Sequence, residues 1–277
     1  MARRKDKSTQ QNLVNDSAKA LLANIRFMSV DSPIKKIVIT SSIPNEGKTF
    51  VSINLAQAIA SSNRTCLLIE GDLRKRSIAR DMGVHPEHGL YAVISGEVPF
   101  NRAVAVTPQR GLYFLDAEPQ IPNPPDLFGS KSFSDFLEKA SEQVDYVVID
   151  TPPVTTFVDS AVVAAQSDVT FLVVREDFTK KRFVTDACEQ LRKADVRLGG
   201  VIMNCCASSS DSYYGYYGYY YDYYNYGSSE QTAESEKGMS YAVSDGSGVS
   251  TLESDDGKTG GQDFAPSRSS RGSHSKD

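Results

Sequence analysis

An alternation of short apolar runs with helical segments, between residues 34 and 204, limits most strongly what this chain can fold into. The apolar runs have the length of buried strands, and they are KKIVIT (35–40), TCLLIEGD (65–72), DYVVID (145–150), DVTFLVV (168–174) and GGVIMN (199–204), with LYFLDA (112–117) as a further candidate. Helical spacing recurs at 48–62, 131–144, 157–166 and 179–195. This alternation is typical of a mostly parallel sheet with helices on both faces, so we predict an α/β fold.

The composition changes on both sides of this region, and the changes divide the chain. Residues 1–12 are polar and charged, and we expect them to be flexible. A helical pattern starts at residue 13, and we expect one folded domain over 13–206. Residues 207–227 form a linker and a tyrosine cluster, and 228–277 are rich in Ser, Gly, Asp and Glu. Because so few apolar residues are present there, we predict a disordered polar tail.

Length and charge place the chain among ordinary globular proteins. It has 277 residues and a formal net charge of −5, enough for one α/β domain with tails. The sequence contains no stripe of Lys and Arg residues, so it gives no indication of a nucleic-acid partner. The N-terminal residues lack the apolar stretch of a signal peptide, and no run of about 18 apolar residues predicts a membrane span. We therefore expect a cytoplasmic protein.

The stretch SSIPNEGKT directly follows the first apolar run. Its last eight residues, Ser42 to Thr49, match the phosphate-binding pattern G-x-x-x-x-G-K-[ST] except at the first position. In this pattern Gly47 lets the backbone approach the phosphates, Lys48 supplies a charge and Thr49 offers a hydroxyl to Mg²⁺. The predicted helix that follows directs the positive end of its dipole at the nucleotide. The residues expected to contact it are Ser42, Pro44, Asn45, Glu46, Gly47, Lys48, Thr49 and Phe50.

Acidic residues end two other predicted strands. Glu70 and Asp72 end one, and Asp150 ends another. Ligands of open parallel sheets bind beyond the carboxyl ends of the strands, so these acids are expected beside the phosphate loop, where they can hold Mg²⁺ or accept a proton. The alternatives are a helix or turn cap for Asp150 and a surface carboxylate for Glu70. Residues 74–76, RKR, could touch phosphate or form a solvated face.

Three of these segments together resemble one family. SSIPNEGKT, LLIEGDLRK and VVIDTPPV are similar to the Walker A, A′ and B motifs of bacterial tyrosine kinases of the capsule and exopolysaccharide (CpsD/CapB) type. The resemblance covers roughly residues 13–206. Other segments that fit the family are NIRF (24–27), IPNPPDLFGS (121–130), FLVVR (171–175) and GGVIMN (199–204).

The resemblance implies a P-loop NTPase fold, with ATP and Mg²⁺ as cofactors. This fold is unrelated to that of eukaryotic-type kinases, whose H-R-D and D-F-G motifs this sequence lacks. One of the two A′ acids, Glu70 or Asp72, would take the proton of a tyrosine hydroxyl. Asn204 stands where related folds contact adenine. The implied catalytic residues are Lys48, Glu70, Asp72 and Asp150, and the implied metal ligands are Thr49, Asp72 and Asp150.

Ten of the 14 tyrosines of the chain lie in YYGYYGYYYDYYNYG, residues 213–227. This tract matches the autophosphorylated tail of the family. The expected acceptors are Tyr213, Tyr214, Tyr216, Tyr217, Tyr219, Tyr220, Tyr221, Tyr223, Tyr224 and Tyr226. The resemblance further implies a role in synthesis and export of surface polysaccharide. It implies as partners a membrane adaptor of the polysaccharide co-polymerase type that recruits the kinase to the inner face of the membrane, neighbouring copies of the chain for trans-phosphorylation, and a cognate tyrosine phosphatase.

The sequence departs from the family at two places. Glu70 stands where the family usually has aspartate. At the positions of the family's oligomerising pattern E-x-x-R-x-x-R, this chain has Asp16, Lys19 and Leu22. The sequence therefore does not decide whether a ring-shaped octamer forms. Two other functions are considered. A ParA/MinD-type partitioning ATPase would carry an extra lysine early in the loop, where this chain has Ile43. A nucleotide-binding regulator without catalysis is the second alternative.

Overall fold

The structure is a computed structural model that describes residues 2–30, 32–119, 121 and 123–206, with side chains from residue 10 onward. The tyrosine tract and the polar tail predicted from the sequence lie outside these residues.

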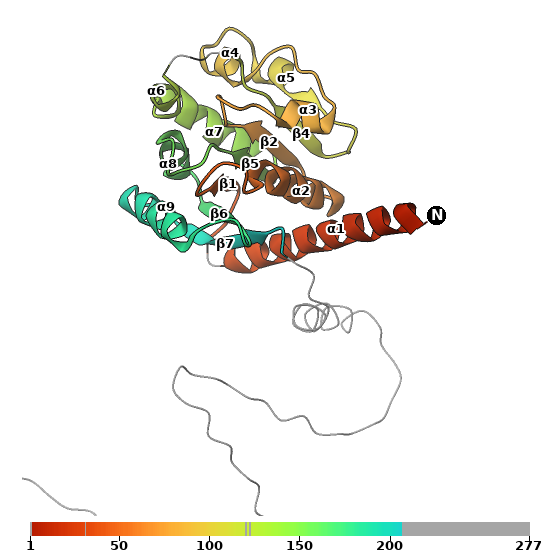
Figure 1. The fold of residues 1–277 in the computed structure, drawn as a ribbon. Helices are drawn as coiled ribbons and strands as arrows, with labels where there is room; N and C mark the ends of the chain where they lie inside the picture. Colours follow the sequence, from red (N-terminus) through yellow and green to blue (C-terminus); the bar gives the residue numbers. More distant parts are fainter. Residues whose placement is uncertain (1, 31, 120, 122, 207–277) are drawn as a thin grey trace, which may run out of the picture. The chain divides into compact units, whose positions relative to one another are not determined.

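A seven-stranded sheet forms the centre of the fold, in the order β3-β4-β2-β5-β1-β6-β7 (Figure 1). All neighbouring strands pair in parallel except β3 and β4. This confirms the predicted mostly parallel sheet. The strands are β1 (Lys36–Ser41), β2 (Cys66–Glu70), β3 (Ala105–Val106), β4 (Leu112–Leu115), β5 (Tyr146–Asp150), β6 (Val169–Arg175) and β7 (Leu198–Asn204).

Helices connect the strands and cover both faces of the sheet, as predicted. The long helices appear where the periodicity indicates them, whereas the short ones between residues 78 and 128 carry too few turns to show a period. The helices are α1 (Ala2–Met28), α2 (Lys48–Ser61), α3 (Ile78–Met82), α4 (Leu90–Ile94), α5 (Phe100–Ala103), α6 (Pro124–Phe128), α7 (Lys131–Gln143), α8 (Asp159–Ala164) and α9 (Lys181–Lys193).

Alternate residues of each central strand enter two separate cores. Ile37 and Ile39 of β1 pack with residues of α1, α2 and α3 on one face. Val38 packs on the other face with residues of α4 to α9. Because both sides of the pleat are covered, nearly every position in such a strand is buried, and this is why β1, β2 and β5 are apolar over most of their length.

The first helix is longer than the sequence pattern suggests. It begins at Ala2 instead of residue 13, and it extends through residues that we expected to be flexible. The segment contains neither Pro nor Gly, and its Arg, Lys and Gln residues have good helix propensity. Leu22, which replaces the last arginine of the oligomerising pattern, is buried against α2 and its neighbours. Asp16 and Lys19 pair with each other at 3.4 Å on the exposed side.

One strand corrects the prediction of burial. We expected 199–204 to be buried, but β7 is an edge strand, and Leu198, Val201 and Met203 are between 38% and 47% exposed. Its parallel pairing with β6 runs from Leu198 to Asn204 with one register shift after Leu198, so hydrogen bonding rather than burial defines this strand. An apolar run alone does not distinguish the two cases.

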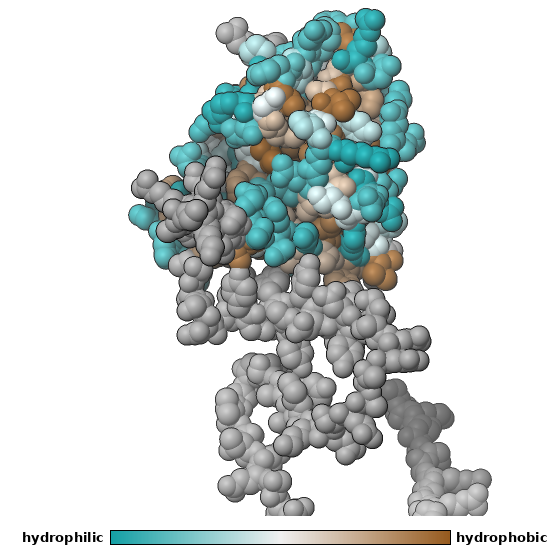
Figure 2. All heavy atoms as spheres, turned by 90° about the vertical axis from the view of Figure 1, so that its right-hand side faces the viewer, coloured by the Kyte–Doolittle hydropathy of each residue, from teal (hydrophilic) through white to brown (hydrophobic). Residues whose placement is uncertain are grey.

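The surface carries mainly hydrophilic residues on the face seen in Figure 2, with apolar residues in separate small groups. Among the helices that the structure describes, none combines the length and the apolar character needed to cross a bilayer.

The order of the central strands positions the site. β2, β5 and β1 are neighbours, and Glu70 at the end of β2 pairs in register with Asp150 at the end of β5. β1 ends beside them at Ser41, where the phosphate loop begins. Three segments far apart in the sequence therefore meet at the carboxyl ends of the central strands.

Candidate active site

The loop between β1 and α2 has the backbone that a phosphate cradle requires. Gly47 has φ +91° and Asn45 has φ +69°, both in the left-handed region. A methyl group at Gly47 would lie 2.0 Å from Nδ2 of Asn204, so only glycine fits there. Asn tolerates the left-handed conformation better than most residues, which explains Asn45 where many such loops have glycine.

Glu46 holds this loop from the inside. Its carboxylate is fully buried and accepts hydrogen bonds from Oγ of Ser42 at 2.9 Å and from the N–H of Ile43 at 2.7 Å. Oγ1 of Thr179, which follows β6, donates to it at 2.5 Å. The carboxylate of Glu46 is directed into the protein and shapes the loop, whereas contact of Glu46 with the nucleotide stays a prediction. Sequence reasoning missed Thr179 because no motif links it to the loop.

The N-terminus of α2 is open toward the loop. Within the described chain, no side chain caps this helix, and its first N–H groups have no intrahelical acceptor. These N–H groups and the positive end of the helix dipole favour an anion at this place. The local geometry therefore fits a phosphate group.

Asp150 lies fully buried beside the first turn of α2. Its Oδ2 accepts a hydrogen bond from Oγ1 of Thr49 at 2.7 Å, and its Oδ1 accepts one from Oγ of Ser52 at 3.0 Å. Because both partners are α2 side chains, Asp150 is not the helix or turn cap considered from sequence. Ser52 was missed, although its position three residues after Thr49 places it on the same face of the helix.

Glu70 and Asp72 have different surroundings. The fully buried Glu70 carboxylate accepts hydrogen bonds from the N–H groups of Ser77 at 2.9 Å and Ile78 at 3.1 Å, so it fixes the start of α3. Surface exposure of Glu70, considered from the sequence, is therefore wrong. Oδ2 of Asp72 lies 2.9 Å from Nζ of Lys48. Of the two A′ acids, Asp72 is the one that contacts the phosphate-loop lysine.

Burial and charge alter the protonation of this cluster. Burial opposes the charged form of Lys48, but the Asp150 and Asp72 carboxylates outweigh it and raise the pKa of the ammonium. Burial and then repulsion from Asp150 raise the pKa of Glu70 to about 8. Burial also raises the pKa of Asp150, while Lys48 and Thr49 oppose this shift. Two carboxylates thus pair with Lys48, and the Glu70 carboxyl lies beside them without contacting it.

The donor set fits Mg²⁺ bound together with a phosphate. Mg²⁺ prefers oxygen ligands and is usually held by one or two carboxylates plus substrate phosphates. The hydroxyl of Thr49 and the carboxylates of Asp150 and Asp72 are such ligands, and Lys48 links the two acids at 3.5 and 2.9 Å. Among the residues described, no group of three His, Cys, Asp or Glu is placed to hold a metal ion.

The remaining predicted nucleotide contacts surround the loop. Nδ2 of Asn204, at the end of β7, donates to the carbonyl of Glu46 at 2.8 Å. Pro44 and Asn45 are exposed on the loop, and Phe50 is 51% exposed on α2. All the predicted residues of the loop therefore lie at one place with Asn204, whereas contact of Asn204 with adenine stays a prediction.

Residues 74–76 are all exposed, which agrees with the solvated face considered from the sequence, and not all of them reach the phosphate loop. Arg74 pairs with the buried Asp159 at 3.0 Å, and Arg76 pairs with the buried Asp116 at 2.8 Å. Nζ of Lys75 approaches Oδ1 of Asn45 at 3.5 Å. Only the middle residue of the three thus contacts the phosphate loop.

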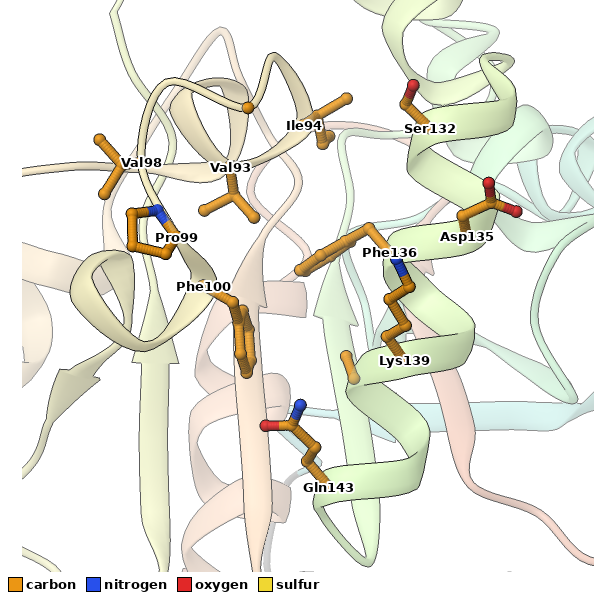
Figure 3. A pocket seen from close by; sticks show the side chains of 12 residues that line it. Val93, Ile94, Val98, Pro99, Phe100, Ser132, Asp135, Phe136, Lys139 and Gln143 are labelled. Atoms are coloured by element: carbon orange, nitrogen blue, oxygen red, sulfur yellow. The ribbon is translucent and has the colours of Figure 1, made fainter.

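A cavity of about 520 Å³ lies away from this site, between α4, α5 and α7. Figure 3 shows Phe100 and Phe136 within it, and the centroids of their rings are 5.8 Å apart. Asp135, Lys139 and Gln143 line the α7 side. None of the phosphate-loop residues lines this cavity, so it is separate from the candidate active site.

Known proteins with similar sequences agree with this geometry. A family model described as an AAA domain matches residues 34–192. Tyrosine-protein kinase YwqD of Bacillus subtilis is 32% identical over 205 residues, which are 74% of this chain and 86% of YwqD. Tyrosine-protein kinase CpsD of Streptococcus pneumoniae serotype 4 is 34% identical over 189 residues, 67% of this chain and 81% of CpsD.

Solved structures that resemble this chain also include a bacterial tyrosine kinase. The kinase domain of Escherichia coli tyrosine kinase Etk is 30% identical, with a TM-score of 0.66, over 72% of this chain and 79% of that domain. This chain covers only 26% of the whole Etk protein of E. coli K12. The cell division ATPase MinD of Pyrococcus furiosus is 22% identical, with a TM-score of 0.55, over 64% of this chain and 74% of that chain, and it shares the fold. The chain thus has a P-loop NTPase fold and belongs to the bacterial tyrosine-protein kinases.

Proposed function

We propose that this chain transfers the terminal phosphoryl group of ATP to tyrosines of the tract 213–227, in another copy of the chain. The observation that carries the proposal is the contact between Lys48 of the phosphate loop and the two carboxylates of Asp72 and Asp150, at 2.9 and 3.5 Å. Phosphoryl transfer depends on positioning and on charge stabilisation, and these groups supply both.

In the proposed reaction, the tyrosine oxygen forms a bond to the terminal phosphorus while the bond from that phosphorus to the bridging oxygen of ADP breaks. The phenol proton passes to a carboxylate. A neutral phenol, with a pKa of about 10, is a poor nucleophile, so a base beside the phosphate raises the rate. Lys48 and the N–H groups at the start of α2 stabilise the charge on the transferred group. Mg²⁺, held by Thr49, Asp150 and Asp72, would supply further charge neutralisation.

We infer that Asp72 is this base and Glu70 a positioning residue. The Glu70 carboxylate accepts two backbone N–H groups at the start of α3, at 2.9 and 3.1 Å, so it is already engaged inside the protein. Asp72 is also buried, but it contacts Lys48 directly. The extra methylene of Glu70, compared with the aspartate usual in the family, reaches the α3 backbone and leaves the next acid facing the nucleotide.

The finer parts of the function are inferred from family membership. They are control of capsule or exopolysaccharide synthesis and export, recruitment to the inner face of the membrane by an adaptor of the polysaccharide co-polymerase type, and reversal by a cognate tyrosine phosphatase. A linker between domain and tract raises the local concentration of the tyrosines around active sites, which favours phosphorylation between copies.

Incubation of the purified full chain with Mg-ATP, with and without the cytoplasmic piece of a candidate adaptor, tests the proposal. Mass spectrometry is expected to find phosphotyrosine within residues 213–226. Lys48→Met is expected to reduce labelling by about 10²-fold or more, because no other group supplies a positive charge inside the loop. ATP hydrolysis without any tyrosine modification, even with the adaptor present, would overturn the proposal.

The two alternatives predict different results in the same experiment. A partitioning ATPase would hydrolyse ATP and leave the tract unmodified, and its signature lysine is absent at Ile43. A regulator without catalysis would bind Mg-ATP and produce neither ADP nor phosphotyrosine. The kinase is favoured because Asp72 contacts Lys48 at 2.9 Å in spite of the unusual Glu70.

A further inference from the structure

A second cavity, of about 470 Å³, opens beside the A′ acids, and we call it the arginine cavity. Three guanidinium groups line it together with one hydroxyl side chain and apolar walls. The lining includes Arg74, Arg76, Arg80, Ser77, Leu73 and Ala79. Each of the three arginines has an aspartate partner, which is Asp159 for Arg74, Asp116 for Arg76 and Asp81 for Arg80.

Buried carboxylates hold two of these arginines in place. Asp159 accepts a hydrogen bond from Arg74, and Asp116 accepts one from Arg76. The two aspartate side chains are only 2% and 6% exposed. Arg76 donates from Nη2 alone, considering the residues that the structure describes, so its other N–H groups stay available. The third arginine, Arg80, is 78% exposed and pairs with its neighbour Asp81. A guanidinium that is fixed from behind loses less conformational freedom when it binds an anion.

The cavity is joined to the proposed base through one short segment. Oδ1 of Asp72 accepts hydrogen bonds from the N–H groups of Arg74 at 3.3 Å and Lys75 at 3.0 Å. Oδ2 of the same carboxylate contacts Lys48. The backbone of Arg74, which lines the cavity, therefore donates directly to the proposed base.

The tyrosine tract has a spacing that suits two neighbouring sites. Tyrosines recur at every third position, at Tyr214, Tyr217, Tyr220, Tyr223 and Tyr226. In an extended chain three residues span roughly 10 Å, so one tyrosine can lie at the phosphoryl-transfer site while another lies beside it. A phosphotyrosine carries about −1.5 to −2 charges and three acceptor oxygens. Arginine forks bind such a group through paired hydrogen bonds.

We propose that the arginine cavity binds a phosphotyrosine already formed in the tract of another copy, and so positions the next tyrosine of that tract for transfer. Each phosphorylation then favours the following one, and the tract advances in steps of three residues. This inference rests on the proposed function, because the phosphotyrosine is the product of that reaction.

Peptide binding to the purified full chain without nucleotide tests the cavity directly. The probe is the 15-residue segment 213–227, labelled with a fluorophore, with phosphotyrosine at position 220 or unmodified. Anisotropy is expected to show at least about tenfold tighter binding of the phosphopeptide, the effect of one or two hydrogen bonds to a charged group. Excess inorganic phosphate is expected to compete. Equal affinity of the two peptides would overturn the inference.

Two variants and a control assign the binding to the arginines. Arg80→Ala removes an exposed side chain, and Arg76→Lys keeps the charge beside Asp116 but not the fork. Both are expected to reduce the preference for the phosphopeptide about five- to tenfold. Arg192→Ala removes an exposed arginine of α9 and is expected to leave the preference unchanged. An unchanged preference in both cavity variants would overturn the inference.

Two further measurements separate this inference from the proposed function and from a lipid site. If mass spectrometry finds no phosphotyrosine in the full chain under any condition, the proposed function fails. If the tract is phosphorylated but the phosphopeptide is not preferred, only the arginine cavity fails. Binding of phosphatidylglycerol vesicles that is lost in Arg80→Ala, with phosphopeptide binding unchanged, would assign the cavity to lipid headgroups and overturn the inference.

Discussion

The phosphate loop and the A′ segment lie at the same edge of the sheet, yet their sequences constrain them differently. In the loop, Gly47 has no room for a side chain and the buried Glu46 fixes the turn, so each position has one use. In the A′ segment, two acids that are two residues apart contact different groups. Glu70 accepts hydrogen bonds from N–H groups at the start of α3, and Asp72 contacts Lys48. The motif therefore places both acids at the carboxyl ends of the strands but does not decide which one contacts Lys48.

Substitution of the two A′ acids tests this comparison with the largest expected effect. Asp72→Asn keeps the shape of the side chain but removes the base and the charge beside Lys48. We expect the rate of tract phosphorylation, measured with Mg-ATP in single-turnover experiments, to fall by about 10²- to 10⁴-fold. Glu70→Gln is expected to lower the rate by less than tenfold, because Glu70 is already engaged by the N–H groups at the start of α3.

The controls for this pair are circular dichroism and nucleotide binding. Both variants are expected to keep the secondary structure, and Glu70→Gln is expected to bind a fluorescent ATP analogue normally. If Glu70→Gln lowers the rate as much as Asp72→Asn while it still binds ATP, Glu70 is the base and the inferred roles are reversed.

The pH dependence of stability sharpens the same contrast. Because burial and repulsion from Asp150 raise the pKa of Glu70 to about 8, the folded chain keeps a proton there that the unfolded chain loses above a pKa near 4.5. The free energy of unfolding is therefore expected to fall as pH rises between these two values, by at most about 1.4 kcal/mol per pH unit for this group.

Urea unfolding between pH 5 and pH 8 measures this slope. In Glu70→Gln the slope is expected to be smaller, because the amide does not titrate. Part of the slope is expected to persist, since burial also raises the pKa of Asp150. A slope that is identical in the two proteins would show that Glu70 is ionised throughout this range and that the hydrogen bonds at the start of α3 dominate its protonation.

The sequence predicts much of the fold and of the site, for physical reasons that differ from element to element. Strands such as β1 and β5 are buried on both faces and so are apolar over most of their length, with polar residues at their carboxyl ends. β7 is equally apolar, but its exposure depends on its place at the edge of the sheet, which no local pattern encodes. The convergence of Lys48, Asp72 and Asp150 follows from parallel strands that end together.

Contacts between distant segments explain what sequence reasoning missed. Thr179 donates to Glu46 across 133 residues of chain, and Asp159 receives Arg74 across 85 residues. Neither pair has a spacing that a motif could contain. Such partners become visible only when the fold brings them together.

The smallest effect is expected at Thr179, and it tests whether the loop depends on support from outside its motif. Thr179→Val has nearly the same shape but cannot donate to the buried Glu46 carboxylate. We expect a loss of about 1–2 kcal/mol in the free energy of unfolding, with a several-fold weaker affinity for a fluorescent ATP analogue, because the loop loses one of its fixed contacts.

Thr107→Val is the matched control for this variant. Thr107 is buried and its hydroxyl donates to the carbonyl of Leu112 at 2.9 Å, at the β3–β4 edge of the sheet far from the loop. A similar loss of stability is expected there, with unchanged nucleotide affinity. If both variants weaken nucleotide binding equally, the effect follows from general destabilisation. If only Thr179→Val weakens it, the phosphate loop depends on a residue that its own pattern does not include.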